Sequence, residues 1–196
     1  MTSLTENEKK SLLILFKDFN SYYNANSLSK KLSISRIGSR KILKKLEKEE
    51  LLIFKEIGKS IVYKPNMYND YATDVLSFLL SDEANKFRRW KDEFKEIFKQ
   101  DRIVMLYGSV LINYSKAKDV DIMIIRKKEE SGEIHKIIAE RQKFISKKVH
   151  AIDISSEEFV KNIMQKEKPI LDIVKNAVVL FGQNKYVGLI KNVTTF

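Results

Sequence analysis

The spacing of apolar residues changes along the chain, and this change restricts the fold to a mixed architecture with two parts. Up to residue 99, apolar residues recur mostly three or four positions apart, as on one face of a helix. From residue 100, short apolar runs alternate with amphipathic segments, as strands alternate with helices. A chain of 196 residues can form two small domains with separate cores. We therefore expect an α+β protein with domains at 1–68 and 100–196, joined by a helical segment at 69–99.

The composition excludes several kinds of site. Because the chain has no cysteine and only two histidines, it offers neither a thiolate zinc site nor a cysteine nucleophile, and any metal has to be bound by carboxylates. No apolar stretch approaches the roughly 20 residues of a membrane-spanning helix, and the N-terminus lacks the pattern of a signal peptide. We expect a cytoplasmic protein that does not bind membranes.

The net charge of +11 points to an anionic partner. Lys and Arg side chains near phosphates release condensed counterions, which favours binding to nucleic acid or to a nucleotide. Basic proteins without such a partner are also common in lysine-rich proteomes, so the positions of the charges have to decide. The N-terminal third of the chain is more densely basic than the rest.

The first domain is predicted to hold three helices followed by a β-hairpin. A side chain able to cap a helix opens each helical segment, and the expected helices cover residues 5–19, 27–32 and 35–49. Two β-type runs follow, at 51–54 and 61–63. Gly58 lies between them and can adopt the positive φ that a hairpin turn needs. The predicted order is helix, helix, turn, helix and hairpin.

The third predicted helix has one cationic face. Side chains four residues apart share a face of a helix, so small and apolar residues gather on one side of this segment. The other side carries Ile37 together with four cations: Arg36, Arg40, Lys41 and Lys44. Taken alone, such a face is most often an ordinary solvated surface.

With the hairpin included, residues 5–66 resemble the winged helix-turn-helix family of DNA-binding domains. The resemblance implies that the third helix enters the major groove while the hairpin contacts the adjacent backbone. It makes Arg36 and Arg40 candidates for contacts with base edges. The candidates for phosphate contacts are Lys41, Lys44, Lys55 and Lys59. One departure is Glu50, which stands where the family often has a glycine, and winged helices also serve as protein-interaction modules.

Residues 71–99 keep the helical spacing of apolar side chains. The segment Ser81-Asp82-Glu83 is a point at which this helix could break. A continuous helix would be roughly 40 Å long, enough to separate two domains or to pair with its copy in a homodimer. Packing of the segment on the C-terminal domain fits the sequence equally well.

In the second domain, two aspartates follow a Gly-Ser pair at a short distance. Gly108 and Ser109 come after a predicted strand at 103–107, and Asp119 and Asp121 open the next strand. Residues two apart lie on the same face of a strand, and two close carboxylates repel each other unless a cation lies between them. Oxygen ligands suit Mg²⁺ or Mn²⁺, while the serine and nearby N–H groups can bind phosphate. The further elements expected in this domain are a helix at 133–141, a strand at 148–154, a helix at 155–164 and a strand at 178–181.

The pattern G-S-x9-D-x-D resembles the nucleotidyltransferase superfamily that includes polymerase β, most closely its minimal members, over residues 100–185. The resemblance implies metal ions bound by three catalytic carboxylates: Asp119, Asp121 and Asp153. It also implies that Gly108 and Ser109 bind the phosphates of a nucleoside triphosphate, and that pyrophosphate leaves in an in-line displacement. An arginine typical of these members is absent after the Gly-Ser pair, and Lys118 or Lys116 could supply its charge. His150 is expected to be an ordinary strand residue.

Three functions fit these features. The first is a regulator that binds double-stranded DNA and whose second domain binds a nucleoside triphosphate with magnesium. The second domain of this regulator could also transfer a nucleoside monophosphate to an acceptor, such as a protein. The second is a catalytically silent transcription factor that uses the second domain for ligand sensing or dimerisation. The third is an enzyme whose basic N-terminal domain recognises tRNA or a protein partner. We expect the first.

Overall fold

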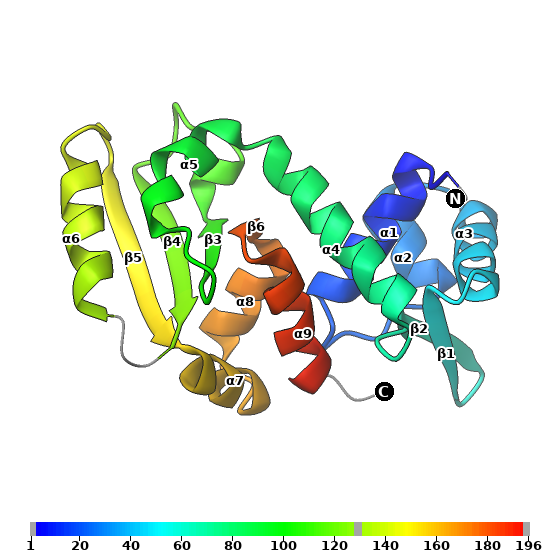
Figure 1. Cartoon of the computed structure of the whole chain (residues 1–196). Helices are drawn as coiled ribbons and strands as arrows, with labels where there is room; N and C mark the ends of the chain where they lie inside the picture. The colour runs from blue at the N-terminus through cyan, green and yellow to red at the C-terminus, as the bar shows by residue number, and fades with distance from the viewer. Residues whose placement is uncertain (1–2, 128–130, 194–196) are drawn as a thin grey trace. The chain divides into compact units, whose positions relative to one another are not determined.

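The computed structural model describes residues 3–127 and 131–193, and it confirms the α+β class (Figure 1). The chain divides into two compact units, of which the first ends at Leu79 and the second covers Leu80–Val193. The boundary falls within helix α4 (Asp70–Asn85), so the segment predicted as a linker is shared between the units. Among the helices of the described residues, none is long and apolar enough to cross a membrane.

The first unit has the predicted order of helices and strands. Its elements before α4 are α1 (Glu6–Lys17), α2 (Ala25–Leu32), α3 (Arg36–Lys48), β1 (Leu52–Ile57) and β2 (Ser60–Pro65). The capping box of α1 is confirmed, because the Glu8 carboxylate accepts a hydrogen bond of 2.8 Å from the backbone N–H of Thr5. The cap predicted for α2 is wrong: Asn24 caps this helix, and its side chain accepts hydrogen bonds from two backbone N–H groups.

One face of α3 holds the core of this unit together. Ser39, Leu43 and Leu46 are buried on the side that the sequence predicted to be small and apolar. The hairpin of β1 and β2 pairs in antiparallel register, and a single bridge joins β2 to the segment before α2 through Tyr63 and Tyr23. This arrangement of three helices and a hairpin is that of a winged helix-turn-helix.

The helical segment after the hairpin breaks later than expected. Helix α4 continues through Ser81-Asp82-Glu83, so the helix does not break there. It ends at Asn85, so residues 71–99 do not form one continuous helix either. A short helix α5 (Arg88–Glu93) and a 3-10 turn η1 (Lys95–Ile97) follow. Trp90 of α5 is buried and stacks on Phe94, with 6.0 Å between the ring centroids. This tryptophan therefore belongs to a hydrophobic core.

A four-stranded mixed sheet forms the centre of the second unit. Its strands are β3 (Ile103–Tyr107), β4 (Asp119–Arg126), β5 (Lys148–Ser155) and β6 (Val178–Phe181). They lie side by side in the order β5, β4, β3, β6 (Figure 1). Strand β3 is antiparallel to β4 and β6, whereas β4 and β5 are parallel. The remaining elements are the 3-10 turn η2 (Ser109–Leu111) and the helices α6 (Ser131–Gln142), α7 (Ser156–Met164), α8 (Lys168–Asn176) and α9 (Gln183–Val193), of which the sequence did not predict α8 and α9.

Side chains alternate between the two faces of this sheet. Val120, Ile122 and Ile124 of β4 are buried in the core formed with α5, η1 and α6. Helices α7 and α9 also contact the sheet, on the face where Met123 is buried. Because odd-numbered residues of β4 share that second face, Asp119 lies on it at the beginning of the strand.

A substitution at Glu50 tests the backbone geometry at the end of α3. Glu50 has φ 57°, which is the left-handed conformation that favours glycine. We expect Glu50→Gly to raise the free energy of unfolding of the first unit by about 0.5–1 kcal/mol, because the relief of this strain exceeds the extra chain entropy of glycine. Urea denaturation checks the prediction, with Glu49→Gly at the preceding position, where φ is −85°, as the matched control. Destabilisation by both substitutions would contradict it.

Candidate functional sites

The cationic face of α3 borders a groove in the first unit. The groove has a volume of about 580 Å³ and runs between α3, the start of α2 and the hairpin. Arg36 and Arg40 line it from α3, and Lys59 lines it from the hairpin turn. Ile37, also on this wall, has 71% of its surface exposed. An open groove with cations on two walls can hold an anionic backbone while an apolar side chain remains available for contact.

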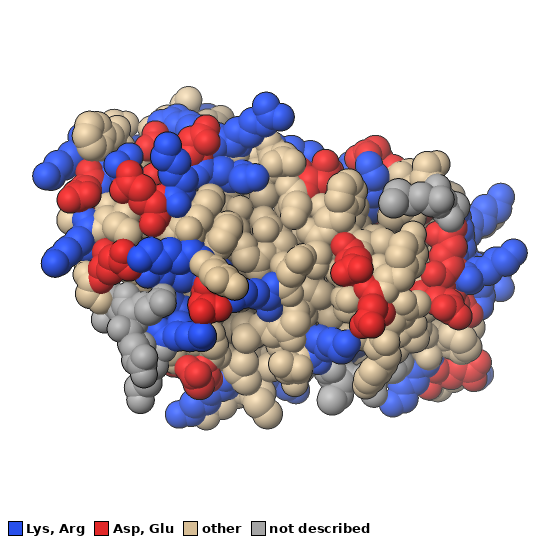
Figure 2. All heavy atoms as spheres, viewed as in Figure 1, with Lys and Arg blue, Asp and Glu red and all other residues tan. Residues whose placement is uncertain are grey.

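The structure separates the other predicted DNA contacts into two groups. Lys44 lines the groove, but its ammonium lies 2.9 Å from the Glu47 carboxylate, and this hydrogen bond raises the pKa of Lys44. Lys41 and Lys55 are exposed and do not line the groove. Figure 2 shows Lys and Arg side chains projecting from the edge of the molecule over α3, with acidic side chains beside them. The predicted cationic surface is therefore present but partly neutralised.

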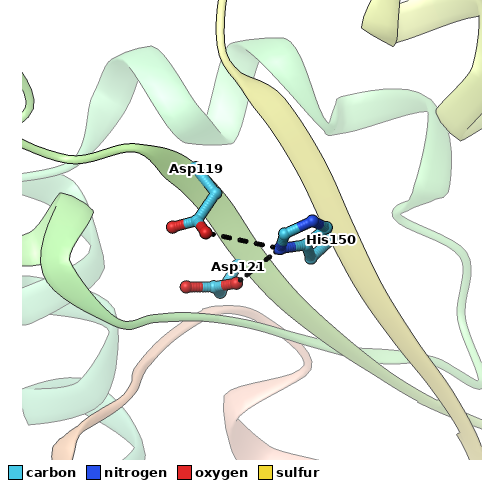
Figure 3. Close-up of side chains that lie close together, drawn as sticks. All are labelled: Asp119, Asp121 and His150. Carbon is cyan, nitrogen blue, oxygen red and sulfur yellow. Dashed lines mark ion pairs between the residues drawn. The ribbon is translucent and has the colours of Figure 1, made fainter.

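In the second unit, two aspartates and a histidine lie together at one end of the sheet (Figure 3). The Nδ1 atom of His150 on β5 lies 3.5 Å from a carboxylate oxygen of Asp119 and 3.5 Å from one of Asp121. All three residues are partly exposed, and one ligand atom of each lies within 4.8 Å of the others. Asp121 and His150 are register partners on parallel strands, which is why their side chains share a face.

The Gly-Ser turn lies directly against this cluster. Gly108 has φ 81°, and a Cβ atom built on it would be 2.4 Å from Oδ2 of Asp121. Only glycine therefore fits at this position without moving the carboxylate. Ser109 follows at the surface and begins η2, and its carbonyl accepts hydrogen bonds of 3.1 Å from two backbone N–H groups of the loop. The backbone of the Gly-Ser turn therefore lies close to the Asp121 carboxylate.

Burial and charge make ionisation of Asp121 unfavourable. Burial raises the pKa of Asp121 above its usual value, and the Asp119 charge raises it further, while His150 lowers it. Burial also raises the pKa of Tyr107, the register partner of Asp121 on β3, to about 12, with the two carboxylates contributing. The cluster is therefore an electronegative site that a cation would stabilise.

Asp153 does not join the cluster, and the expectation that it supplies a third carboxylate there is wrong. It pairs in register with Ile124, so it lies on the opposite face of the sheet and three positions along β4 from Asp121. There its carboxylate forms a nearly buried two-pronged ion pair with Arg126, with N–O distances of 2.6 and 3.1 Å. His150, expected to be an ordinary strand residue, lies where a third ligand would be needed.

The lysines proposed for nucleotide binding are exposed at the edge of the cluster. Lys116 and Lys118 both lie in the loop that leads to Asp119, and Lys118 directly precedes it. The same loop is fixed by Lys147, whose ammonium donates to the carbonyl of Ala117. Among the described residues, no side chain forms an ion pair with Lys118, which leaves its charge available at the surface.

Comparisons with known proteins do not assign the chain to a family. No protein-family model matches it, and no curated protein matches its sequence. Among solved structures, three variants of Lactococcus lactis ZitR match with sequence identities of 17%, 17% and 19%. The matches cover 48–51% of this chain and only 63–66% of the ZitR chains, with TM-scores of 0.38–0.39. Similarity at this level carries no conclusion about function.

Replacement of Asp121 by asparagine is expected to stabilise the metal-free protein at neutral pH. Because the folded-state pKa is raised, the ionised carboxylate is less favourable in the folded chain than in the unfolded one, and stability falls as the pH rises through the range of ionisation. The substitution removes this loss, so we expect the melting temperature of the second unit to rise by about 2–4 °C at pH 7.5. At pH 3, where the Asp121 carboxyl group is as neutral as the asparagine amide, the increase in melting temperature should vanish.

Thermal unfolding in the presence of EDTA measures this difference. Asp92→Asn, at an exposed position of α5, is the matched control and should change nothing. A melting temperature of Asp121→Asn equal to or below that of the unsubstituted protein at pH 7.5 would contradict the conclusion that ionisation of Asp121 is unfavourable in the folded chain.

Proposed function

We propose that the first unit binds double-stranded DNA. The observation that carries this proposal is the groove between α3 and the hairpin, with Arg36 and Arg40 on one wall and Lys59 on the other. An α-helix fits the major groove, and arginine can donate two hydrogen bonds to the edge of guanine. The exposed Ile37 is suited to apolar contact with a thymine methyl group. Lys59, at the hairpin turn, is suited to the phosphate backbone.

Substitutions on α3 should separate base contacts from phosphate contacts. Arg40→Ala is expected to weaken binding to a duplex selected from a random library by about 5–150-fold and to relax its sequence preference. Lys41→Gln should weaken binding to all duplexes alike and reduce the slope of log affinity against log salt by about 1. Fluorescence anisotropy at several salt concentrations measures both effects.

The matched control is Lys10→Gln, at an exposed position of α1, a helix that, unlike the α3 helix of Lys41, contributes no residue to the groove. It should leave the affinity and its salt dependence unchanged. If Arg40→Ala binds the selected duplex as tightly as the unsubstituted protein does, α3 is not the recognition helix.

We also propose that the second unit binds a nucleoside triphosphate together with a divalent cation. The proposal is supported by the carboxylates of Asp119 and Asp121 at the end of β4, next to the Gly108 turn that leaves room for no side chain. It is further supported by the antiparallel pairing of β3 with β4. This pairing places the Gly-Ser turn at the end of β3 beside the aspartates at the start of β4. A nucleotide is anionic, so it can approach this site only with cations.

The donor set fits a divalent ion with some affinity for nitrogen. Two carboxylates and the Nδ1 atom of His150 could bind Mn²⁺, which accepts imidazole more readily than Mg²⁺ does. When bound, such an ion would neutralise phosphate charge. Asp119 and Asp121 would hold it, Gly108 and Ser109 would face the phosphates, and Lys118 would add a positive charge. The proposal is confined to binding, since Asp153 is paired with Arg126 and cannot activate an acceptor hydroxyl there.

Nucleotide binding should stabilise the protein in a metal-dependent way. A ligand at about 100 times its Kd adds about 2.7 kcal/mol to the free energy of unfolding. We therefore expect a nucleoside triphosphate with Mn²⁺ to raise the melting temperature by several degrees, and Asp119→Asn to abolish the rise. Differential scanning calorimetry checks this, with Asp92→Asn as the control that keeps the rise. An equal rise with Asp119→Asn would place the nucleotide elsewhere.

A further inference from the structure

A pocket opens beside the Gly-Ser turn, next to the aspartate cluster. Its volume is about 430 Å³, which lies within the range of small-molecule sites, about 300–1,000 Å³. Tyr107 and Gly108 form the wall nearest the cluster, because Gly108 also lies against Asp121. The pocket and the proposed phosphate site therefore share Gly108 and adjoin each other.

The walls of the pocket are suited to a flat apolar ring. Leu111 and Ile112 line one side from the loop after Gly108, and Ile173 lines the other from α8. Ile112 is 89% exposed, an unusual state for an isoleucine in a folded unit, and a ring in the pocket would cover part of it. Apolar walls hold a base by contact area and do not distinguish one base from another.

Besides Tyr107, the polar side chains that line the pocket come from one face of α8. Asp172 and Asn176 are four residues apart and both line it. The side-chain amide of Asn176 donates a hydrogen bond of 2.8 Å to the carbonyl of Asp172, which leaves its side-chain oxygen as an acceptor. Among the described residues, no side chain pairs with the Asp172 carboxylate. The pocket thus presents hydrogen-bond acceptors.

We propose that this pocket binds the base of the nucleotide and that Asp172 selects guanine. Guanine alone among the four common bases carries two adjacent donors, the ring N1–H and the 2-amino group, which match the two oxygens of a carboxylate. Adenine and cytosine place a ring acceptor beside their amino group, and that acceptor would face the carboxylate and repel it. Uracil offers a single N–H between two carbonyls. The inference rests on the proposed nucleotide binding and adds the identity of the base.

Calorimetric titration of the full chain with GTP, ATP, CTP and UTP in the presence of Mn²⁺ tests the selection. We expect GTP to bind at least tenfold more tightly than the other three. Asp172→Asn should weaken GTP binding about tenfold and should strengthen ATP binding, because an amide can donate to the ring acceptor of adenine that the carboxylate repels. Asp92→Asn, the matched control, should keep the preference for GTP.

A second ligand distinguishes a change of base selection in Asp172→Asn from misfolding of this variant. Xanthosine triphosphate carries a carbonyl where GTP has its 2-amino group, so it presents a donor beside an acceptor, and the side-chain amide that Asp172→Asn introduces could match both. The variant should therefore bind xanthosine triphosphate about tenfold more tightly than the unsubstituted protein does, which a misfolded variant could not do.

The outcomes separate the two proposals. Binding of all four nucleotides within a factor of three, lost in Asp119→Asn, would overturn the selection of guanine and leave nucleotide binding intact. A GTP preference that Asp172→Asn does not change would also overturn it. Absence of binding by any nucleotide to the folded, Mn²⁺-loaded chain would overturn the proposed function and this inference together.

Discussion

The alternation of side chains along β4 determines where the chemistry of the second unit can take place. Its even-numbered residues fill the core with α5 and α6, and its odd-numbered residues begin with Asp119 and Asp121 on the other face. The strand neighbours then decide which groups join them: β3 places Tyr107 and the Gly108 turn beside Asp121, and β5 adds His150. The hydrophobic core and the polar cluster thus both result from the alternation of side chains along β4.

The two candidate sites carry opposite charges. In the first unit, arginines border an open groove and can meet phosphates directly. In the second unit, the Asp121 carboxylate lies against a glycine turn, and burial together with the Asp119 charge raises the pKa of Asp121. A polyanion can bind the first surface unaided, whereas the second requires a cation as intermediary. The proposed functions of both sites therefore involve phosphate-bearing partners.

Much of this organisation could be predicted from local sequence. Strand β3 has the predicted limits, the capping box of α1 forms, and the apolar side of α3 is the buried one. Helix α8 was missed because no side chain caps its start, although Pro169 in its first turn is typical of the beginning of a helix. The start of α2 was placed too late, at Ser27, because Asn24 and Ser27 can both cap a helix; in the structure Asn24 is the cap, and Ser27 accepts a hydrogen bond from its backbone N–H.

The position of Asp153 could not be predicted in the same way. Both faces of β5 carry buried apolar residues, Val149 on one and Ile154 on the other, so the pattern does not show which face Asp153 shares. Only the pairing of Asp121 with His150 fixes that register. A comparison of both possible registers of β5 against β4 would have identified His150 as a candidate neighbour of the aspartates.

Anomalous scattering tests the proposed metal site most directly. Crystals grown with Mn²⁺ and a nucleoside triphosphate, measured near the manganese absorption edge, should show a peak bound by oxygens of Asp119 and Asp121, with phosphate density over Gly108. Ordered carboxylates without a peak between them, at saturating Mn²⁺ and nucleotide, would contradict the account.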